Sequence, residues 1–313
     1  MRKDKVWHMV IPSISNETSP LQCVLLGVAD QSGPTPKYEE AYDPKSRLHI
    51  LKGTYPKEQD LIHQLDFMQA ILEKHGVEVL RPDIVSNCNQ IFSRDIAFVI
   101  EDCLYISNIL PARDKEIDAI QYVLDRIPDQ NIRTIPEDVH VEGGDVIVHN
   151  DFLFVGYYDQ PNYADYVTAR TNAKALSYLS AQFLQKKVIG FELNKSNDDP
   201  FANTLHLDCC FQPFGNELAI VCPEGFMHRE DVAWIENHFG SENLFFTDKQ
   251  SMFEMQSNLL SVRPDLVISD PSFTAVNKWL NTKGIQIVTV PYDEISKQGG
   301  LFRCSTLPLI RKA

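Results

Sequence analysis

Five side chains suited to an active site each stand directly before a pair of short apolar runs. They are Asp95, Glu142, His206, Asp208 and Cys304. A thiol becomes an effective nucleophile when a neighbouring imidazolium or a positively charged substrate lowers its pKa. We therefore expect Cys304 to be a nucleophile and His206 to supply that charge and act as general acid and base. Glu142 would orient the imidazole, as the third member of a triad does.

The two remaining carboxylates indicate the charge of the substrate. Asp95 and Asp208 are acceptor-only groups, and paired carboxylates suit a planar cation that carries several N–H donors. Taken singly, a cysteine near a C-terminus is more often a packing residue, and a His-x-Asp pair is often a surface pair or half a metal site. No third ligand stands at metal spacing, so we expect no metal. The joint occurrence of these residues supports a site.

The elements that would position these residues repeat along the chain. Each unit reads as a hairpin of two short strands, then a helix, then one more strand. Hairpins are predicted at 95–107, 144–156, 207–221 and 257–269, with 21–30 as half of a fifth. Helices are predicted at 58–75, 114–126, 162–185, 229–238 and 272–283. Closing strands are predicted at 77–80, 132–135, 188–193, 243–246 and 285–290, and a last strand at 301–310.

Five ββαβ units with a half-unit at each end predict a closed ring, an α/β propeller of five pseudo-symmetric blades. The last strand would complete the first unit. The alternative is an open α/β sheet whose hairpins are similar by accident. Because no linker-like stretch divides the chain, we expect one domain over residues 1–313. In a ring, equivalent positions face one axis, so the polar residues would converge on a central pocket together with Asn258, which shares their phase.

Composition restricts the class of protein. The chain is 43% hydrophobic and 23% charged, and no apolar run is long enough to cross a bilayer. Seven cysteines without a CxxC pair argue against a disulfide framework and favour the cytosol. A net charge of −14 argues against nucleic acid and anionic membranes as partners and is compatible with a small cationic substrate. A monomer and a homo-oligomer both stay open.

Four motifs resemble those of the guanidino-group-modifying enzymes, which include arginine deiminases, dimethylarginine hydrolases and glycine amidinotransferases. The motifs are "FSRD" from Phe92, "EGGDV" from Glu142, "HLD" from His206 and the near-terminal "GG…RCSTLPL", in the same order and spacing over about 21–311. The resemblance implies the pentein fold, a five-bladed α/β propeller, and a Cys–His–acid site that needs no cofactor. It also implies that Asp95 and Asp208 hold the guanidinium.

The motifs differ in which member of this superfamily they favour. "HLD" is shared by deiminases and amidinotransferases, whereas "EGGD" and "RCSTLPL" are closer to deiminases. "MQSN", which ends at Asn258, is similar to amidinotransferases, and the helical insertion that arginine deiminases carry before their "FTRD" motif is absent. Arg170 resembles an arginine that binds the substrate carboxylate in deiminases and methylarginine hydrolases. We also expect Phe92 and Asn258 to contact substrate.

The resulting expectation is an arginine deiminase-like hydrolase. Cys304 would attack the guanidinium carbon, ammonia would leave from a thiouronium-like intermediate, and water would release a ureido product, citrulline if arginine is the substrate. An amidinotransferase and a dimethylarginine hydrolase remain open as alternatives. A third alternative, from another class, is a pentein ring that binds a ligand without catalysis.

Overall fold

The computed structural model describes residues 8–312, so both ends of the predicted domain, at 1 and 313, lie outside the described residues. The described strands are β1 (Leu21–Leu26), β2 (Glu78–Leu80), β3 (Ala97–Ile100), β4 (Cys103–Ile106), β5 (Ile132–Thr134), β6 (Val146–His149), β7 (Phe152–Tyr157), β8 (Lys187–Glu192), β9 (Phe211–Phe214), β10 (Leu218–Val221), β11 (Leu244–Phe246), β12 (Leu260–Arg263), β13 (Leu266–Ser269), β14 (Gln286–Thr289) and β15 (Thr306–Arg311). The described α-helices are α1 (Pro44–Leu51), α2 (Glu58–Lys74), α3 (Ser93–Ile96), α4 (Asp114–Asp118), α5 (Gln121–Leu124), α6 (Lys174–Gln182), α7 (Arg229–Phe239), α8 (Lys249–Phe253), α9 (Thr274–Thr282) and α10 (Asp293–Ser296).

The described strands pair into five sheets of three strands, and every sheet has the same plan. An antiparallel hairpin is followed by a third strand that runs parallel to the hairpin's second strand, as in β3-β4-β5 and β6-β7-β8. In the first sheet the C-terminal strand β15 pairs antiparallel with β1, and β2 pairs parallel with β1. The predicted repeat is therefore confirmed, including the last strand that completes the first unit. The closing of all five sheets into a ring stays a prediction.

Three of the predicted hairpins turn at a residue with positive φ. Glu101 and Asn150 have φ of 52°, and Gly215 has φ of 57°. These values lie in the left-handed region, which tight hairpin turns require and which glycine and asparagine adopt at low cost.

Two predicted helices are wrong in extent. The predicted helix at 114–126 is divided into α4 and α5, because the chain leaves helical geometry at Ile120, which is buried. The predicted helix at 162–185 contains only α6 and a short 3-10 turn, η5 (Tyr163–Asp165). Its first half is a loop, because its polar groups find partners elsewhere: Asn172 donates its backbone N–H to the carbonyl of His140 and accepts from the backbone N–H of that residue.

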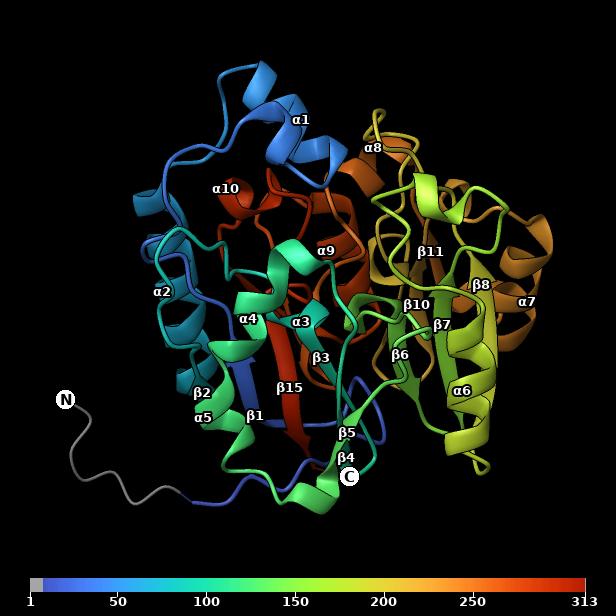
Figure 1. Ribbon diagram of the computed structural model, residues 1–313. Helices are drawn as coiled ribbons and strands as arrows, with labels where there is room; N and C mark the ends of the chain where they lie inside the picture. Colours follow the sequence, from blue (N-terminus) through green and yellow to red (C-terminus); the bar gives the residue numbers. More distant parts are fainter. Residues whose placement is uncertain (1–7, 313) are drawn as a thin grey trace.

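Helix α1 was not predicted. Asp43 caps it by accepting from the backbone N–H of Ser46 at 2.8 Å, and Pro44 occupies its first turn. Helix α1 lies at one end of the molecule, above the strands in Figure 1.

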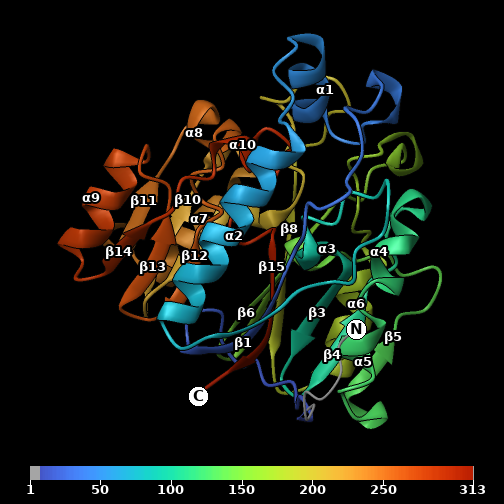
Figure 2. The same cartoon turned by 90° about the vertical axis from the view of Figure 1, so that its left-hand side faces the viewer.

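The core consists of three clusters of buried apolar side chains. The first cluster joins α2 and α9 to β1, β12 and β13. The second joins α5 and α6 to β3, β4, β6 and β15. The third joins α7 to β7, β8, β9 and β10. The helices α2, α6 and α7 lie at the outer margin of the strands (Figures 1 and 2). None of the helices in residues 8–312 has the length and apolar character that a membrane span needs.

A single helical turn precedes the hairpins that carry the predicted site. These turns are α3 before β3, η4 (Gly143–Asp145) before β6 and η6 (Leu207–Cys209) before β9. Asp95 lies in the first turn, and Glu142 and His206 are the N-cap residues of the second and third. The site residues that directly precede a hairpin in the sequence therefore occupy one recurrent position in the structure.

Candidate active site

A cavity of about 230 Å³ lies where these turns meet. Five of the predicted site residues line it: Phe92, Asp95, Arg170, His206 and Cys304. The segment before α2, including η1 (Tyr38–Glu40) and the start of α1, lines the cavity from the other side. The carboxylates that line the cavity outnumber its arginines: they are Glu40, Asp43, Glu58, Asp95 and Glu116, against Arg113 and Arg170. The charge of the cavity therefore favours a cation.

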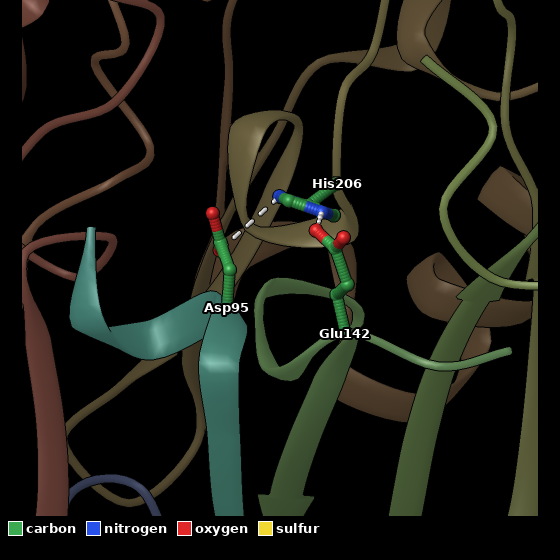
Figure 3. Close-up of side chains that lie close together, drawn as sticks. All are labelled: Asp95, Glu142 and His206. Atoms are coloured by element: carbon green, nitrogen blue, oxygen red, sulfur yellow. Dashed lines mark hydrogen bonds and ion pairs between the residues drawn. The ribbon is translucent and has the colours of Figure 1, made fainter. Parts of the chain in front are cut away.

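His206 and Glu142 form a buried pair beside the cavity. Nε2 of His206 lies 2.9 Å from Oε2 of Glu142, and each side chain is about 1% exposed. Figure 3 shows both side chains pointing toward each other from separate turns. Burial alone would raise the pKa of Glu142, but the Arg170 guanidinium, the bond from His206 and the charge of Arg113 lower it to about 2. Glu142 is therefore a carboxylate that fixes the imidazole.

The other ring nitrogen of His206 faces Asp95. Nδ1 lies 3.6 Å from Oδ1 of Asp95. Figure 3 marks this contact with a dashed line. Burial disfavours the imidazolium, but the carboxylates of Asp95, Asp145 and Glu142 outweigh it and raise the pKa of His206. The ring is therefore suited to donate a proton near neutral pH. Within the described residues, Oδ1 of Asp95 accepts no hydrogen bond, which leaves an acceptor at the cavity wall.

Cys304 lies in the turn before β15, held by Asn258. Its sulfur lies 3.1 Å from Nδ2 of Asn258, and its backbone N–H donates to Oδ1 of the same amide at 3.1 Å. The oxygens of Asp208 lie 3.8 and 3.9 Å from the sulfur. Burial, followed by the charge of Asp208, raises the pKa of the Cys304 thiol well above its ordinary value. The thiol is therefore protonated at neutral pH in the free protein, so the expectation that His206 lowers its pKa is wrong for this state, because burial and the Asp208 carboxylate oppose ionisation.

Three predicted residues stand behind the cavity rather than along its wall. Glu142 lies behind His206, and Asp208 and Asn258 lie beside Cys304. Asp208 is fully buried and accepts from Nη1 of Arg303 at 2.7 Å. Its predicted contact with substrate, and that of Asn258, stay predictions.

Arg170 lines the cavity from the loop before α6. Its Nη1 lies 3.2 Å from Oε1 of Glu142, and its Nη2 donates to the carbonyl of Tyr42 at 3.3 Å. Arg170 thus supports the charge of Glu142 and ties this loop to the segment before α1. Its predicted contact with a substrate carboxylate stays a prediction.

Two residues that the sequence analysis missed complete the charged wall. Arg113 donates to Oδ2 of Asp95 at 2.8 Å and makes a two-point pair with Glu116 at 2.7 and 2.9 Å. Its Nη1 also lies 3.9 Å from Glu142. The pair of Arg113 and Glu116 could have been predicted from the sequence, because residues three apart at the start of a helix lie on the same face. The contact with Asp95 carries no local signal.

The glycine pair before Cys304 permits close packing against the cavity. Gly299 has φ of +81°, and a Cβ there would lie 2.8 Å from Oδ1 of Asp43. A Cβ on Gly300 would lie 2.3 Å from the ring of Phe92. Both positions therefore require glycine, because the wall formed by Asp43 and Phe92 leaves no room for a side chain.

Asp95, Glu142 and His206 also offer ligand atoms within 4.8 Å of one another, as a metal site would. Both carboxylates are already paired with a guanidinium, Asp95 with Arg113 and Glu142 with Arg170. A divalent cation would lie beside two fixed positive charges and would replace the bond between His206 and Glu142. These residues fit proton transfer better than metal binding.

A family model described as N,N dimethylarginine dimethylhydrolase, eukaryotic, matches residues 51–311. Among curated proteins, the uncharacterized protein YkgA of Bacillus subtilis is 29% identical over 77% of this chain and 77% of its own length. An arginine deiminase of Bacillus cytotoxicus is 24% identical over 88% of this chain and 74% of its own length.

Solved structures share the fold. AgrE in complex with ornithine and NAD+ has a TM-score of 0.75 and 20% identity over 93% of this chain, which spans only 39% of AgrE. The N-terminal domain of ArgZ, a cyanobacterial arginine dihydrolase, bound to its substrate, has a TM-score of 0.73 and 18% identity over 92% of this chain and 98% of that domain. SxtG, an amidinotransferase from Microseira wollei, has a TM-score of 0.71 and 16% identity over 96% of this chain and 98% of its own. At these identities the likeness shows the fold alone, a mixed α/β fold of the pentein type.

Proposed function

The chain belongs to the N,N dimethylarginine dimethylhydrolase family, and from that premise we propose that it hydrolyses the guanidino group of a small cationic substrate. The observation that carries the proposal is the meeting of three groups at one acidic cavity. These are the Cys304 thiol, the buried His206–Glu142 pair and the Asp95 oxygen Oδ1, which accepts no hydrogen bond within the described residues. A thiol, a proton donor and a carboxylate are the groups that covalent hydrolysis of a guanidinium requires.

The first half of the reaction forms a covalent intermediate. A guanidinium bound to Asp95 lowers the pKa of the Cys304 thiol, whose proton leaves to solvent. The sulfur attacks the guanidinium carbon to give a neutral tetrahedral adduct. The imidazolium of His206 protonates one nitrogen, which departs as ammonia, and leaves a cationic thiouronium on Cys304 and a neutral imidazole. Glu142 stabilises the imidazolium at the start of this step.

The second half releases the product. Neutral His206 takes a proton from water as its oxygen attacks the thiouronium carbon. The C–S bond breaks, and the departing ureido group gives up its extra proton, which restores the Cys304 thiol. Overall, the guanidinium and water become a ureido group and ammonium.

Arginine is the substrate that we propose first, with citrulline as product. Asp208 beside the sulfur is a second carboxylate for the unsubstituted edge of a guanidinium, and methylation would remove the N–H donor that it needs. Arg170 is the candidate for the α-carboxylate, because it lines the cavity. The family match favours a second candidate, N,N-dimethylarginine, from which dimethylamine would leave.

The direct test is a product assay. The protein is incubated with arginine, N,N-dimethylarginine, agmatine and guanidinoacetate, each with and without glycine, and a Cys304→Ser variant is the control. Ammonia with citrulline from arginine is the expected result. Dimethylamine with citrulline from dimethylarginine alone would favour the second candidate. Ornithine that appears only when glycine is present would contradict hydrolysis and indicate amidino transfer.

The Cys304 thiol is expected to ionise near neutral pH only when a guanidinium is bound. Burial and Asp208 raise its pKa in the free protein, and a neighbouring cation lowers it. The measurement is the ultraviolet absorbance of thiolate against pH, with and without guanidinium ion at a non-denaturing concentration. Sodium ion at equal ionic strength is the control, and the Cys304→Ser spectrum is subtracted. A thiolate at neutral pH without guanidinium, or no response to it, would argue against substrate activation.

Domain organisation and compartment are also part of this proposal. We treat residues 1–313 as one catalytic domain. All seven cysteines are free, which supports a reducing compartment such as the cytosol.

A further inference from the structure

A buried ion network lies directly beneath the candidate nucleophile, on the side away from the cavity. Arg303, the residue before Cys304, is fully buried, and its guanidinium bridges two carboxylates. Nη1 donates to Oδ2 of Asp208 at 2.7 Å, and Nη2 donates to Oε1 of Glu17 at 3.0 Å and to the carbonyl of Val146 at 2.7 Å. Arg303 does not itself line the cavity, and the mechanism does not use it directly.

Glu17 reaches this network from a segment that precedes β1, residues 13–20, which we call the N-terminal strap. The strap crosses the ends of several hairpins: Ile14 pairs with Glu101, the backbone N–H of Glu17 donates to the carbonyl of Val148 at 2.9 Å, and Thr18 donates to the carbonyl of Gly215 at 2.7 Å. The strap is therefore attached to three sheets. Its anchoring holds the carboxylate of Glu17 in place under Arg303.

Arg303 compensates the buried negative charge of the Asp208 carboxylate. Asp208 itself is fully buried. The charged or titratable groups that face this network are Glu17, Asp95, Arg94, Arg303, Arg311, His149, Cys209, Cys210 and Cys304. Only Arg303 makes an ion pair with Asp208 among the described residues. A buried carboxylate without such a partner takes up a proton, because burial penalises the charged form. Removing Arg303 would therefore change the charge of the group nearest the sulfur.

Asp208 keeps one oxygen for another partner. Its Oδ2 is taken by Arg303, while the contacts of Oδ1 within residues 8–312 are the weak thiol contacts of Cys209 at 3.7 Å and Cys304 at 3.9 Å. A guanidinium whose carbon approaches the sulfur would bring an N–H group near this oxygen.

We propose that Arg303 is a positioning residue: anchored by Glu17 of the N-terminal strap, it holds the Asp208 carboxylate beside the Cys304 sulfur to receive the substrate's guanidinium. The substrate in this statement rests on the proposed function, whereas the charge state of Asp208 does not. Arg303 acts through Asp208 and does not touch the reacting atoms.

The test compares Arg303→Gln with a matched control, Arg311→Gln. Arg311 is also a buried arginine that faces this network and donates to the carbonyls of Ser19 in the strap and Ser261, but among the described residues it makes no ion pair with Asp208, so it separates loss of that pair from loss of a strap contact. In Arg303→Gln, Asp208 loses its ion-pair partner and, as a buried carboxylate, is expected to take up a proton. The acid limb of the pH profile of kcat/KM should then move toward alkaline pH. Below the midpoint of that limb, kcat/KM should fall about tenfold for each pH unit. Arg311→Gln should keep the wild-type profile.

An infrared measurement reads the charge of Asp208 without activity. Arg303→Gln at neutral pH is expected to show the C=O band of a protonated carboxyl group, which is absent from the wild type and from the Arg303→Gln/Asp208→Asn double variant. No such band, with activity lost equally at all pH values, would overturn the proposal. If the wild type hydrolyses no guanidino compound, the proposed function fails, and the band still tests the pair of Arg303 and Asp208.

Should Arg303→Gln not fold, Arg303→Lys serves as the second variant. Its single ammonium keeps a positive charge but cannot span Glu17 and Asp208 as the guanidinium does. The acid limb should shift in the same direction by a smaller amount. A folded lysine variant with reduced activity and an unshifted limb would contradict the proposal.

Discussion

Cys304→Ser is expected to lower kcat/KM on the best guanidino substrate by about 10⁴-fold or more, since loss of a nucleophile removes the whole covalent route. The sulfur of Cys304 is the atom that Asn258 and Asp208 surround. A serine hydroxyl in the same place has a far higher pKa, and a bound guanidinium does not ionise it near neutral pH. Steady-state kinetics on the purified variant measure the loss.

The control for this variant is Cys103→Ser. Cys103 is a free, half-buried cysteine at the start of β4, and its thiol contacts Asp102. It should keep wild-type kinetics. Turnover by Cys304→Ser within about tenfold of the wild type would remove Cys304 from the mechanism.

His206→Asn is expected to lower kcat by about 10²- to 10⁴-fold, because the same imidazole donates a proton in one half-reaction and accepts one in the other. The change should fall mainly on kcat, since Asp95 still binds the guanidinium. The asparagine amide in His206→Asn also cannot hold the proton that Asp95, Asp145 and Glu142 stabilise on the imidazole ring of the wild type. Any limb of the wild-type kcat profile that titrates with His206 should therefore be missing from the variant.

A second histidine–glutamate pair provides the matched control. Nε2 of His228 lies 2.8 Å from Oε2 of Glu192, a geometry close to that of the buried pair, but the His228 side chain is 49% exposed. His228→Asn should leave kcat and the pH profile unchanged. Equal losses in both variants would mean that the effect of His206→Asn is structural rather than catalytic.

The sequence predicted the parts of the site that follow from the repeat. Asp95, Glu142 and His206 stand at equivalent points before successive hairpins, and a repeated backbone brings equivalent points together. Cys304 follows the same rule, since β15 completes the first sheet by pairing with β1. Periodicity and turn residues are local signals, so they can be read without knowledge of long-range contacts.

The contacts between charged side chains were not predictable in the same way. Arg113 joins Asp95 to Glu116, and Arg303 joins Asp208 to Glu17, across separations of up to 286 residues in sequence. Such pairs depend on where side chains end in space, and they leave no periodic pattern. The loop that carries Arg170 was mistaken for helix for a related reason: its polar groups have tertiary partners that outweigh local propensity.

In the proposed mechanism the sulfur of Cys304 bonds covalently to the guanidinium carbon, and a rapid-quench experiment tests this step most directly. The protein is mixed with substrate, quenched in acid during turnover, digested and analysed by mass spectrometry. An amidino adduct is expected on the peptide that contains Cys304, which forms and decays at the rate of turnover and is absent from Cys304→Ser. Product formation with no adduct on that peptide at any time, together with turnover by Cys304→Ser, would contradict it.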